Sequence, residues 1–475
     1  FPQNVIIVVV VSLQSHERAP RFMTRDILGL SDKAFYRKVF AVCLPIMLQQ
    51  LLSTAMYMVD TIMIGGLGDI ELAGVGAANQ LAYLLDICLF GVTGGGSVFM
   101  AQYFGKKDLA GVRRTLGLCI VLAGACAALF VAVAQGFGGF CVGLFSEESA
   151  VTARGVEYLS IASWGYLFKA LVYPFGAVHK STGHAKLPML SGLAGLLVNM
   201  FLNYCLIFGN LGFPMLGVRG AAIATLIGSA VDCGTLLFFS FARDTAARAK
   251  WHELFDHVFA NIRPFIAVSA PVLLDDSIWA LGMLAQNAIY GKMGTDAFAA
   301  MMIVGTVDKL SFILLQGIGT AAAVVIGNTL GASGQDDAYV YGKRFLWLSA
   351  LVGTLVAVLV CTLGVYIPYL YTNTTSATQA LAADTTFVMG FALPLWALNF
   401  TIIVGILRSG GDTRAAAIID LLPMWVISIP LSLLVGLYFK LPLPYVYACQ
   451  HVASLVRLWF ALRRTHRGEW ARQLV

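Results

Sequence analysis

The chain has 475 residues, of which 59% are hydrophobic and only 12% are charged. Soluble domains carry about 25% charged residues, so this composition excludes an ordinary water-soluble protein and favours one that lies in lipid. The net charge of +6 does not indicate nucleic-acid binding, because the basic residues fall mainly in short loops between apolar segments.

The apolar segments predict twelve membrane-spanning helices. Each is long enough to cross a hydrocarbon core about 30 Å thick, and backbone in lipid must satisfy its own hydrogen bonds. The first six spans are placed at 41–66, 73–102, 115–137, 156–178, 189–209 and 219–241. The second six are placed at 265–290, 297–327, 345–368, 384–407, 415–438 and 442–462. The predicted fold class is therefore an all-α integral membrane protein.

The remaining segments divide the chain into lobes and connections. Residues 1–35 are predicted to form an N-terminal extension and cytoplasmic segment. Residues 36–242 form an N-lobe of six spans, and residues 265–463 form a C-lobe of six spans. Residues 243–264 are predicted to be a cytoplasmic linker, and 464–475 a cytoplasmic tail.

Lysine and arginine residues set the predicted orientation. When the N-terminus is placed inside, the outer loops hold only Arg154, Arg219, Lys292 and Lys440, while nearly all other loop cations fall inside. This bias predicts a multi-pass protein of the cell (inner or plasma) membrane with both termini in the cytoplasm.

The two halves of the chain are related by an internal repeat. A shift of 226 residues places Pro45 on Pro271 and aligns four pairs of glycines, Gly65 with Gly291, Gly68 with Gly294, Gly91 with Gly317 and Gly105 with Gly331. Because six spans return the chain to its starting side, the halves are parallel repeats about an axis along the membrane normal. A substrate site between two such lobes is typical of an alternating-access transporter.

Charged residues inside the spans are the candidate functional residues, because a charge at bilayer depth costs at least ~2.5–3.5 kcal/mol. Asp60 comes first, since the repeat places the neutral Gln286 at its position. Asn199 and Asn203 are four residues apart and share one helix face. The secondary candidates for lining a cavity are Asp86, Lys169, Asp275, Asp276, Gln286, Asp308 and Asp420.

Each candidate also has a structural alternative. Asp86 could serve only to pair with Lys169. Asn199 and Asn203 could form ordinary hydrogen bonds between helices, as small polar residues in membranes often do. Both alternatives are left open by the residues themselves.

Several motifs resemble the multidrug and toxic compound extrusion (MATE) family, in its bacterial type. They are PIMLQQ from Pro45, VDTIMIGGLG from Val59, AQYFG from Ala101, NMFLNYCLIFG from Asn199, GVRGAAIAT from Gly217 and LRSGGDT from Leu407. The resemblance implies two six-helix lobes in a V shape. It also implies a secondary active transporter that exports organic, often cationic, drugs or metabolites in exchange for Na⁺ or H⁺.

The resemblance assigns the coupling site as well. In this family the acid of span 1 binds the coupling cation or proton, with polar residues of span 5 beside it, which here are Asp60, Asn199 and Asn203. One branch has an acid where this chain has Asn203, and another has acids in spans 7 and 10. At the span 7 position this chain has Trp279, although Asp275 or Asp276 lies one turn earlier. The span 10 position is Ala397 or Asn399, so Na⁺ and H⁺ both stay open.

The expected mechanism is a rocker switch. Entry of the cation or proton at Asp60 bends span 1 at Pro45, and Pro271 is the corresponding hinge of span 7. We expect no cofactor, no metal beyond Na⁺ at Asp60, no catalytic residues, and therefore no enzyme. The expected partners are a small organic substrate and membrane lipid, with no nucleic acid and a functional monomer. The alternatives are a lipid-linked oligosaccharide flippase of the same superfamily and a non-transporting membrane scaffold or receptor.

Overall fold

The computed structural model describes residues 32–475, apart from 147, 244, 257, 261 and 372–373. The predicted extension and cytoplasmic segment, residues 1–35, thus lies outside the described residues except for 32–35. Every regular element of the described residues is a helix. Ten helices of this part of the chain are long and apolar enough to cross a membrane. The interrupted span 4 and the more polar span 12 complete the twelve-helix layout, and the chain is a multi-pass membrane protein.

The first half of the chain forms spans 1 to 6. They are α2 (Lys33–Gly65), α3 (Asp69–Gly105), α4 (Leu109–Gly143), α5 (Ser149–Ala162) with α6 (Gly165–Ser181), α7 (Lys186–Phe208) and α8 (Val218–Ala242), with the short η1 (Asn210–Gly212) after α7. Span 4 is divided into α5 and α6, which the apolar pattern did not predict. At Trp164 and Leu167 the backbone bonds tighten to three-residue spacing, which ends one helix and starts the next.

The second half forms spans 7 to 12, after α9 (Trp251–Phe255) in the linker. They are α10 (Ile262–Lys292), α11 (Thr295–Ala332), α12 (Gln335–Thr362) with η2 (Gly364–Leu370), α13 (Ser376–Phe400) with η3 (Thr401–Arg408), α14 (Thr413–Pro423) with η4 (Met424–Ser428), α15 (Ile429–Leu433) and η5 (Leu434–Tyr438), and α16 (Leu443–His466). The segments η3, η4 and η5 are π-helical. Spans 10 and 11 are thus locally wider than regular α-helices.

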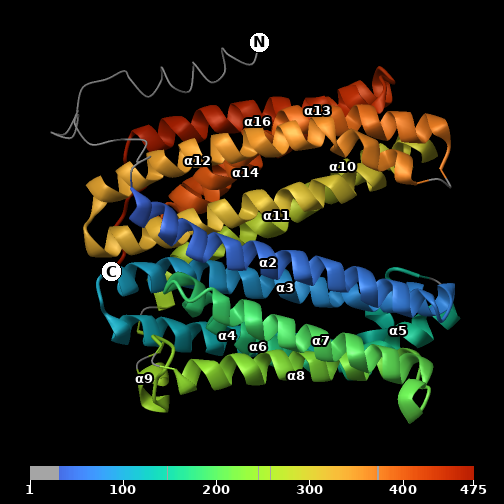
Figure 1. Ribbon diagram of the computed structural model, residues 1–475, viewed down its shortest axis with the longest axis horizontal. Coiled ribbons are helices and arrows are strands. Elements are labelled where there is room, and N and C mark those ends of the chain that lie inside the picture. Colours follow the sequence, from blue (N-terminus) through green and yellow to red (C-terminus); the bar gives the residue numbers. More distant parts are fainter. Residues whose placement is uncertain (1–31, 147, 244, 257, 261, 372–373) are drawn as a thin grey trace.

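The segments predicted to face the cytoplasm gather at one end of the helix bundle (Figure 1). This end, which we call the tail end, holds the start of α2, the short helix α9 and the C-terminus. The opposite end, which we call the far end, holds α5 and the loop that follows α7. Such an arrangement requires an even number of spans.

The two halves of the chain meet at the tail end, where the central helices α3 and α11 cross. A Cβ atom added to Gly105 would overlap the backbone oxygen of Asn328, and one added to Gly331 would overlap the backbone oxygen of Gln102. Gly105 and Gly331 are repeat mates, and so are Gln102 and Asn328. The contact, which we call the seam, is therefore symmetric, and only glycine fits at its centre.

The halves separate toward the far end. On α3, Gly91 touches Leu273 of α10, but Leu84, two turns earlier on the same face, is 51% exposed. On α11, Gly317 touches α2, and its counterpart Leu310 is 45% exposed. Both central helices thus lose contact with the other half at the same level. The two lobes form a V that is closed at the tail end and open at the far end.

Helices α2 and α10 each pass from one lobe into the other. The tail-end half of α2 buries Phe35 and Val39 in a core cluster formed with α11 and α12. The tail-end half of α10 buries Phe265 and Val268 in a cluster with α3 and α4. The far halves of the two helices return to their own lobes, as the contacts described below show. The helix that carries Asp60 is therefore anchored in both lobes.

The predicted tail, residues 464–475, folds back onto the seam. Trp470 is fully buried at 0% exposure. The backbone N–H of Leu474 donates to Gln102 Oε1 at 2.8 Å, and Gln102 Nε2 donates to the carbonyl of Arg472 at 3.1 Å. The end of the chain thereby ties α16 of the second half to α3 of the first.

Candidate functional site

Asp60 lies in the far half of α2, shortly before that helix ends. The helix stops at Gly65, and Gly68 then adopts a φ of 138°, which is easily accessible only to glycine. The turn reverses the chain into α3 and leaves Asp60 on the side of α2 that packs on α7. The repeated glycines at this turn therefore fix the position of the acid.

Two amides of α7 hold the Asp60 carboxylate. Asn203 Nδ2 donates to Asp60 Oδ1 at 2.6 Å. When the Asn199 amide is oriented so that both of its atoms find partners, its Nδ2 donates to the same oxygen at 3.0 Å. Asn199 and Asn203 are 7% and 1% exposed. The three residues singled out by the sequence thus come together, with the asparagines one turn apart on one face of α7.

A second set of groups supports this site from behind, and its part in the site was not predicted. In the same orientation, Asn199 Oδ1 accepts a hydrogen bond from the backbone N–H of Thr225 on α8 at 3.2 Å. The Thr225 hydroxyl lies 3.3 Å from the Tyr158 hydroxyl of α5. Thr225 ends one of the motifs noted in the sequence, but no signal pointed to Tyr158. Four helices, α2, α5, α7 and α8, therefore contribute to the site.

The charge of Asp60 is not balanced by a basic residue within the described part of the chain. Its hydrogen-bonding partners are neutral amides, and its side chain is only partly buried. Asn203 Oδ1 is buried and has no hydrogen-bond partner among the described residues. A carboxylate with neighbouring amide and hydroxyl oxygens is a suitable ligand set for a hard cation such as Na⁺, and the carboxylate alone can accept a proton.

The C-lobe carries an uncharged counterpart of this site. Gln286, the repeat mate of Asp60, donates from Nε2 to Ser428 Oγ at 2.8 Å, and the two are 2% and 4% exposed. Ser428 and Ser432 have the four-residue spacing of Asn199 and Asn203 and follow them by 229 residues. Gly411 follows Gly183 by 228 residues, and the π-helix η4 between Gly411 and Ser432 accommodates the one additional residue.

Asp86 and Lys169, two secondary candidates, form an ion pair between α3 and α6. Lys169 Nζ lies 2.9 Å from both carboxylate oxygens of Asp86, and each side chain is 32% exposed. The pairing left open by the sequence is therefore what the structure shows. Because the charges offset each other, this pair does not resemble the unbalanced site at Asp60.

Asp275 and Asp276 also form ion pairs, with a partner that the sequence analysis placed in an inner loop. Arg408, the last residue of η3, is 8% exposed and donates to Asp275 at 2.8 Å and to Asp276 at 2.9 Å. Asp420 pairs separately with Arg457 at 2.9 Å. Asp275 is 1% exposed, so it does not line an open cavity. The guanidinium occupies the place that a coupling cation would need.

The other candidates lie apart from these clusters. Asp308 and Lys309 on α11 are both exposed, and neither forms an ion pair with another described residue. Pro45 and Pro271 lie inside α2 and α10, as predicted. Each proline lies in the part of its helix that leads from one lobe to the other, which is where a bend would change the angle between lobes.

A family model named MatE matches residues 45–205 and 271–434, one copy in each half of the chain. The chain is 24% identical to a probable multidrug resistance protein NorM of Thermotoga maritima over 441 residues, covering 92% of this chain and 94% of that protein. It is 26% identical to the multidrug resistance protein PmpM of Pseudomonas aeruginosa over 439 residues, covering 86% of both chains.

Solved structures with the same fold include the Vibrio cholerae MATE transporter VcmN in the bent form. That structure matches with a TM-score of 0.82 and 18% identity, covering 92% of this chain and 98% of that chain. The outward-facing conformation of a multidrug resistance MATE family transporter of the MOP superfamily matches with a TM-score of 0.81 and 18% identity, covering 95% and 100%. At this level of identity the likeness concerns the fold alone.

Proposed function

Because the chain belongs to the MatE family of membrane transporters, we propose that it is a secondary active transporter that exports organic, often cationic, drugs or metabolites in exchange for Na⁺ or H⁺. Relatives that are named multidrug resistance proteins support the export of drugs. The distribution of lysine and arginine supports a cell-membrane location with the tail end in the cytoplasm. We further propose that the monomer is the working unit, because each chain contains both lobes.

The observation that carries this proposal is the unbalanced carboxylate of Asp60. Two buried amides hold it in place, yet no basic residue of the described chain neutralises it. Its counterpart in the C-lobe, Gln286, is neutral. A charged group in a membrane is costly unless its charge has a use, and binding a coupling cation or proton is such a use.

The position of Asp60 on α2 links ion binding to movement of the lobes. The far half of α2 contacts α7 of the N-lobe, while its tail-end half lies in the core of the C-lobe. A cation or proton at Asp60 changes the charge at the α2–α7 contact and so the preferred position of the helix. Bending at Pro45, and at Pro271 in α10, then lets the V close at the far end while the seam opens.

Transport by purified protein in proteoliposomes tests this proposal. Ethidium or norfloxacin is supplied as substrate, and Na⁺ and H⁺ gradients are imposed separately. The wild-type protein should transport substrate under one of the two gradients. Asp60→Asn should lose that gradient dependence, because an amide neither accepts the proton nor balances the charge of a cation.

A matched control is Asp384→Asn, which changes an exposed carboxylate on α13. This variant should transport like the wild type. Full transport by Asp60→Asn with unchanged ion dependence would exclude Asp60 as the coupling site. Failure of the wild type under both gradients, with every substrate of a broad panel, would contradict ion-driven export itself.

A further inference from the structure

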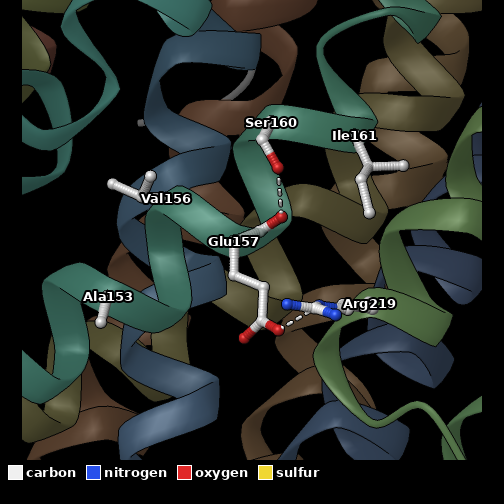
Figure 2. Close-up of a pocket in the computed structure, with 6 residues that line it drawn as sticks. All are labelled: Ala153, Val156, Glu157, Ser160, Ile161 and Arg219. Carbon is white, nitrogen blue, oxygen red and sulfur yellow. Dashed lines mark hydrogen bonds and ion pairs between the residues drawn. The ribbon is translucent and has the colours of Figure 1, made fainter.

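A hollow of about 550 Å³ lies on the surface of the N-lobe, at the far end between α5 and α8 (Figure 2). We call it the Glu157–Arg219 groove. Figure 2 shows the guanidinium of Arg219 reaching from α8 to the carboxylate of Glu157 on α5. The groove is lined by Ala153, Val156, Glu157, Ser160, Ile161 and Arg219.

The groove opens away from the interior of the lobe. The buried face of α5 carries Tyr158 and Leu159, and Tyr158 points toward Thr225 and the Asp60 site. The lining residues of α5 occupy the opposite face of the same helix. In a chain that spans a membrane, the outer face of a lobe borders lipid. The occupant of this groove is therefore to be sought among the components of the bilayer.

The depth of the groove corresponds to the level of lipid headgroups. Arg219 is the second residue of α8, directly before its apolar stretch begins. Basic residues at the ends of spans lie in the interfacial region, where headgroups are found. Val156 and Ile161 extend the wall of the groove along α5 with apolar side chains. The groove thus presents charges at headgroup level and an apolar surface beside them.

The charges of the groove balance one another. Arg219 Nε lies 2.5 Å from one Glu157 oxygen, and Arg154 lies 2.9 Å from the other oxygen of the same carboxylate. Arg154 also lies 3.5 Å from Glu71. Two arginines and two glutamates give no net charge, so a purely anionic ligand is not favoured. The Arg219 side chain is 65% exposed, which leaves N–H donors free to face an additional ligand.

A zwitterion with a short spacing between its charges fits this arrangement. We propose that the groove binds the headgroup of phosphatidylethanolamine, with the phosphate on Arg219 and the primary ammonium on Glu157. The acyl chains then continue along Val156 and Ile161. Phosphatidylcholine carries the same charges, but its quaternary ammonium has no N–H to donate to the carboxylate. The site should therefore prefer the primary amine over the quaternary one.

Lipid in the groove would also support the site at Asp60. The Glu157–Arg219 ion pair and the Tyr158–Thr225 contact both join α5 to α8, on opposite faces of α5. A headgroup that bridges the same two helices holds them together behind the Asn199 and Asp60 contacts. The binding claim itself does not depend on the transport function, because it can be measured on the purified protein alone.

The test measures lipid retention and thermal unfolding of the full chain in bilayer nanodiscs. The discs contain phosphatidylcholine alone, phosphatidylcholine with phosphatidylethanolamine, or phosphatidylcholine with phosphatidylglycerol. Wild-type protein should retain phosphatidylethanolamine over phosphatidylcholine by about tenfold, as one charge-assisted hydrogen bond provides, and unfold at a higher temperature with it. Arg219→Gln and Glu157→Gln should lose both effects.

Two further variants separate binding from general damage. Ile161→Trp fills the groove while leaving its charges intact, and it should also lose the preference. Arg113→Gln breaks a surface ion pair with Glu253 at the tail end, and it should keep the preference. The proposal is overturned if all three groove variants retain it. It is also overturned if phosphatidylglycerol acts as well as phosphatidylethanolamine, or if free phosphoethanolamine alone reproduces the thermal shift.

Discussion

Gln286 and Ser428 are joined by a 2.8 Å hydrogen bond that repeats, in the C-lobe, the contact of Asp60 with Asn199 in the N-lobe. The same two helices of each repeat touch at the same level, but only one of the two contacts contains an acid. One cycle of the lobes should therefore move one coupling charge at these paired positions. The asymmetry lies in the side chains and not in the fold.

Gln286→Glu should create a second site of the Asp60 type. The new carboxylate would be buried beside Ser428 without a basic partner, so the free energy of unfolding should fall by several kcal/mol. Added coupling cation or low pH should restore much of that loss. Thermal unfolding with and without Na⁺ or acid measures this, and stability that does not respond to either contradicts the equivalence of the two sites.

Asn203→Leu should weaken the coupling site. It removes a 2.6 Å hydrogen bond to a carboxylate, and such a bond contributes about 1.5–3 kcal/mol. Transport should then need a higher concentration of the coupling ion for half-maximal rate. Asn210→Leu is the control, since Asn210 bonds only to the Tyr204 carbonyl in an exposed position. Equal ion dependence of the two variants would count against Asn203 as part of the site.

Gly331→Val should prevent the seam from closing, because its side chain would overlap the backbone of Gln102. The variant should lose transport and expose Cys43, which is 6% exposed and contacts Gly317 on the same helix. Maleimide labelling of Cys43, with the other cysteines replaced, measures this. Gly76→Val is the control, because a Cβ there meets no atom within 4 Å. Unchanged labelling of Cys43 would show that the seam does not govern access.

Arg408→Met should destabilise the protein strongly. It leaves two buried carboxylates, Asp275 and Asp276, without their cation, and removing one partner of a buried ion pair typically costs about 3–5 kcal/mol. Arg113→Met, in a more exposed pair, should cost at most about 1 kcal/mol. Unfolding in detergent compares the two. Similar losses for both variants would mean that the Arg408 cluster is structurally unimportant.

Asp32 should make the start of α2 sensitive to acid. The backbone N–H of Phe35, and then the guanidinium of Arg344, hold the pKa of Asp32 below its usual value of about 3.8. A lowered folded-state pKa contributes stability above the unfolded pKa, and this contribution is lost as the pH falls through the folded one. Asp32→Ala should cost about 1 kcal/mol at neutral pH and progressively less below pH ~4. A constant difference across this range would contradict the assignment.

Much of the fold could be predicted because apolar run length and the internal repeat depend on the sequence alone. The same holds for Asp60, Asn199 and Asn203, since a four-residue spacing places two side chains on one helix face in any α-helix. Tyr158 could not be found in this way, because its role depends on how α5 packs against α8. Arg408 was assigned to a loop since it follows an apolar run, and its contact with Asp275 depends on the wider winding of η3.

The C-lobe counterpart shows a further reason. A fixed shift between the halves places Gln286 on Asp60 correctly, but it then passes Ser428 by one position. The additional residue is held in a π-helix, which no hydropathy pattern reveals. Comparison of the contacts, rather than of the sequence register, identifies Ser428 as the partner.

The passage of α2 between the lobes has a consequence for biosynthesis. Phe35 and Val39 are among the first residues to enter the membrane, yet they pack against α11 and α12, which are synthesised some 300 residues later. Until then this half of α2 must be shielded by lipid or by the insertion machinery. Neither half of the chain can complete its own core, so the two halves expressed separately should each be degraded and should accumulate only when made together.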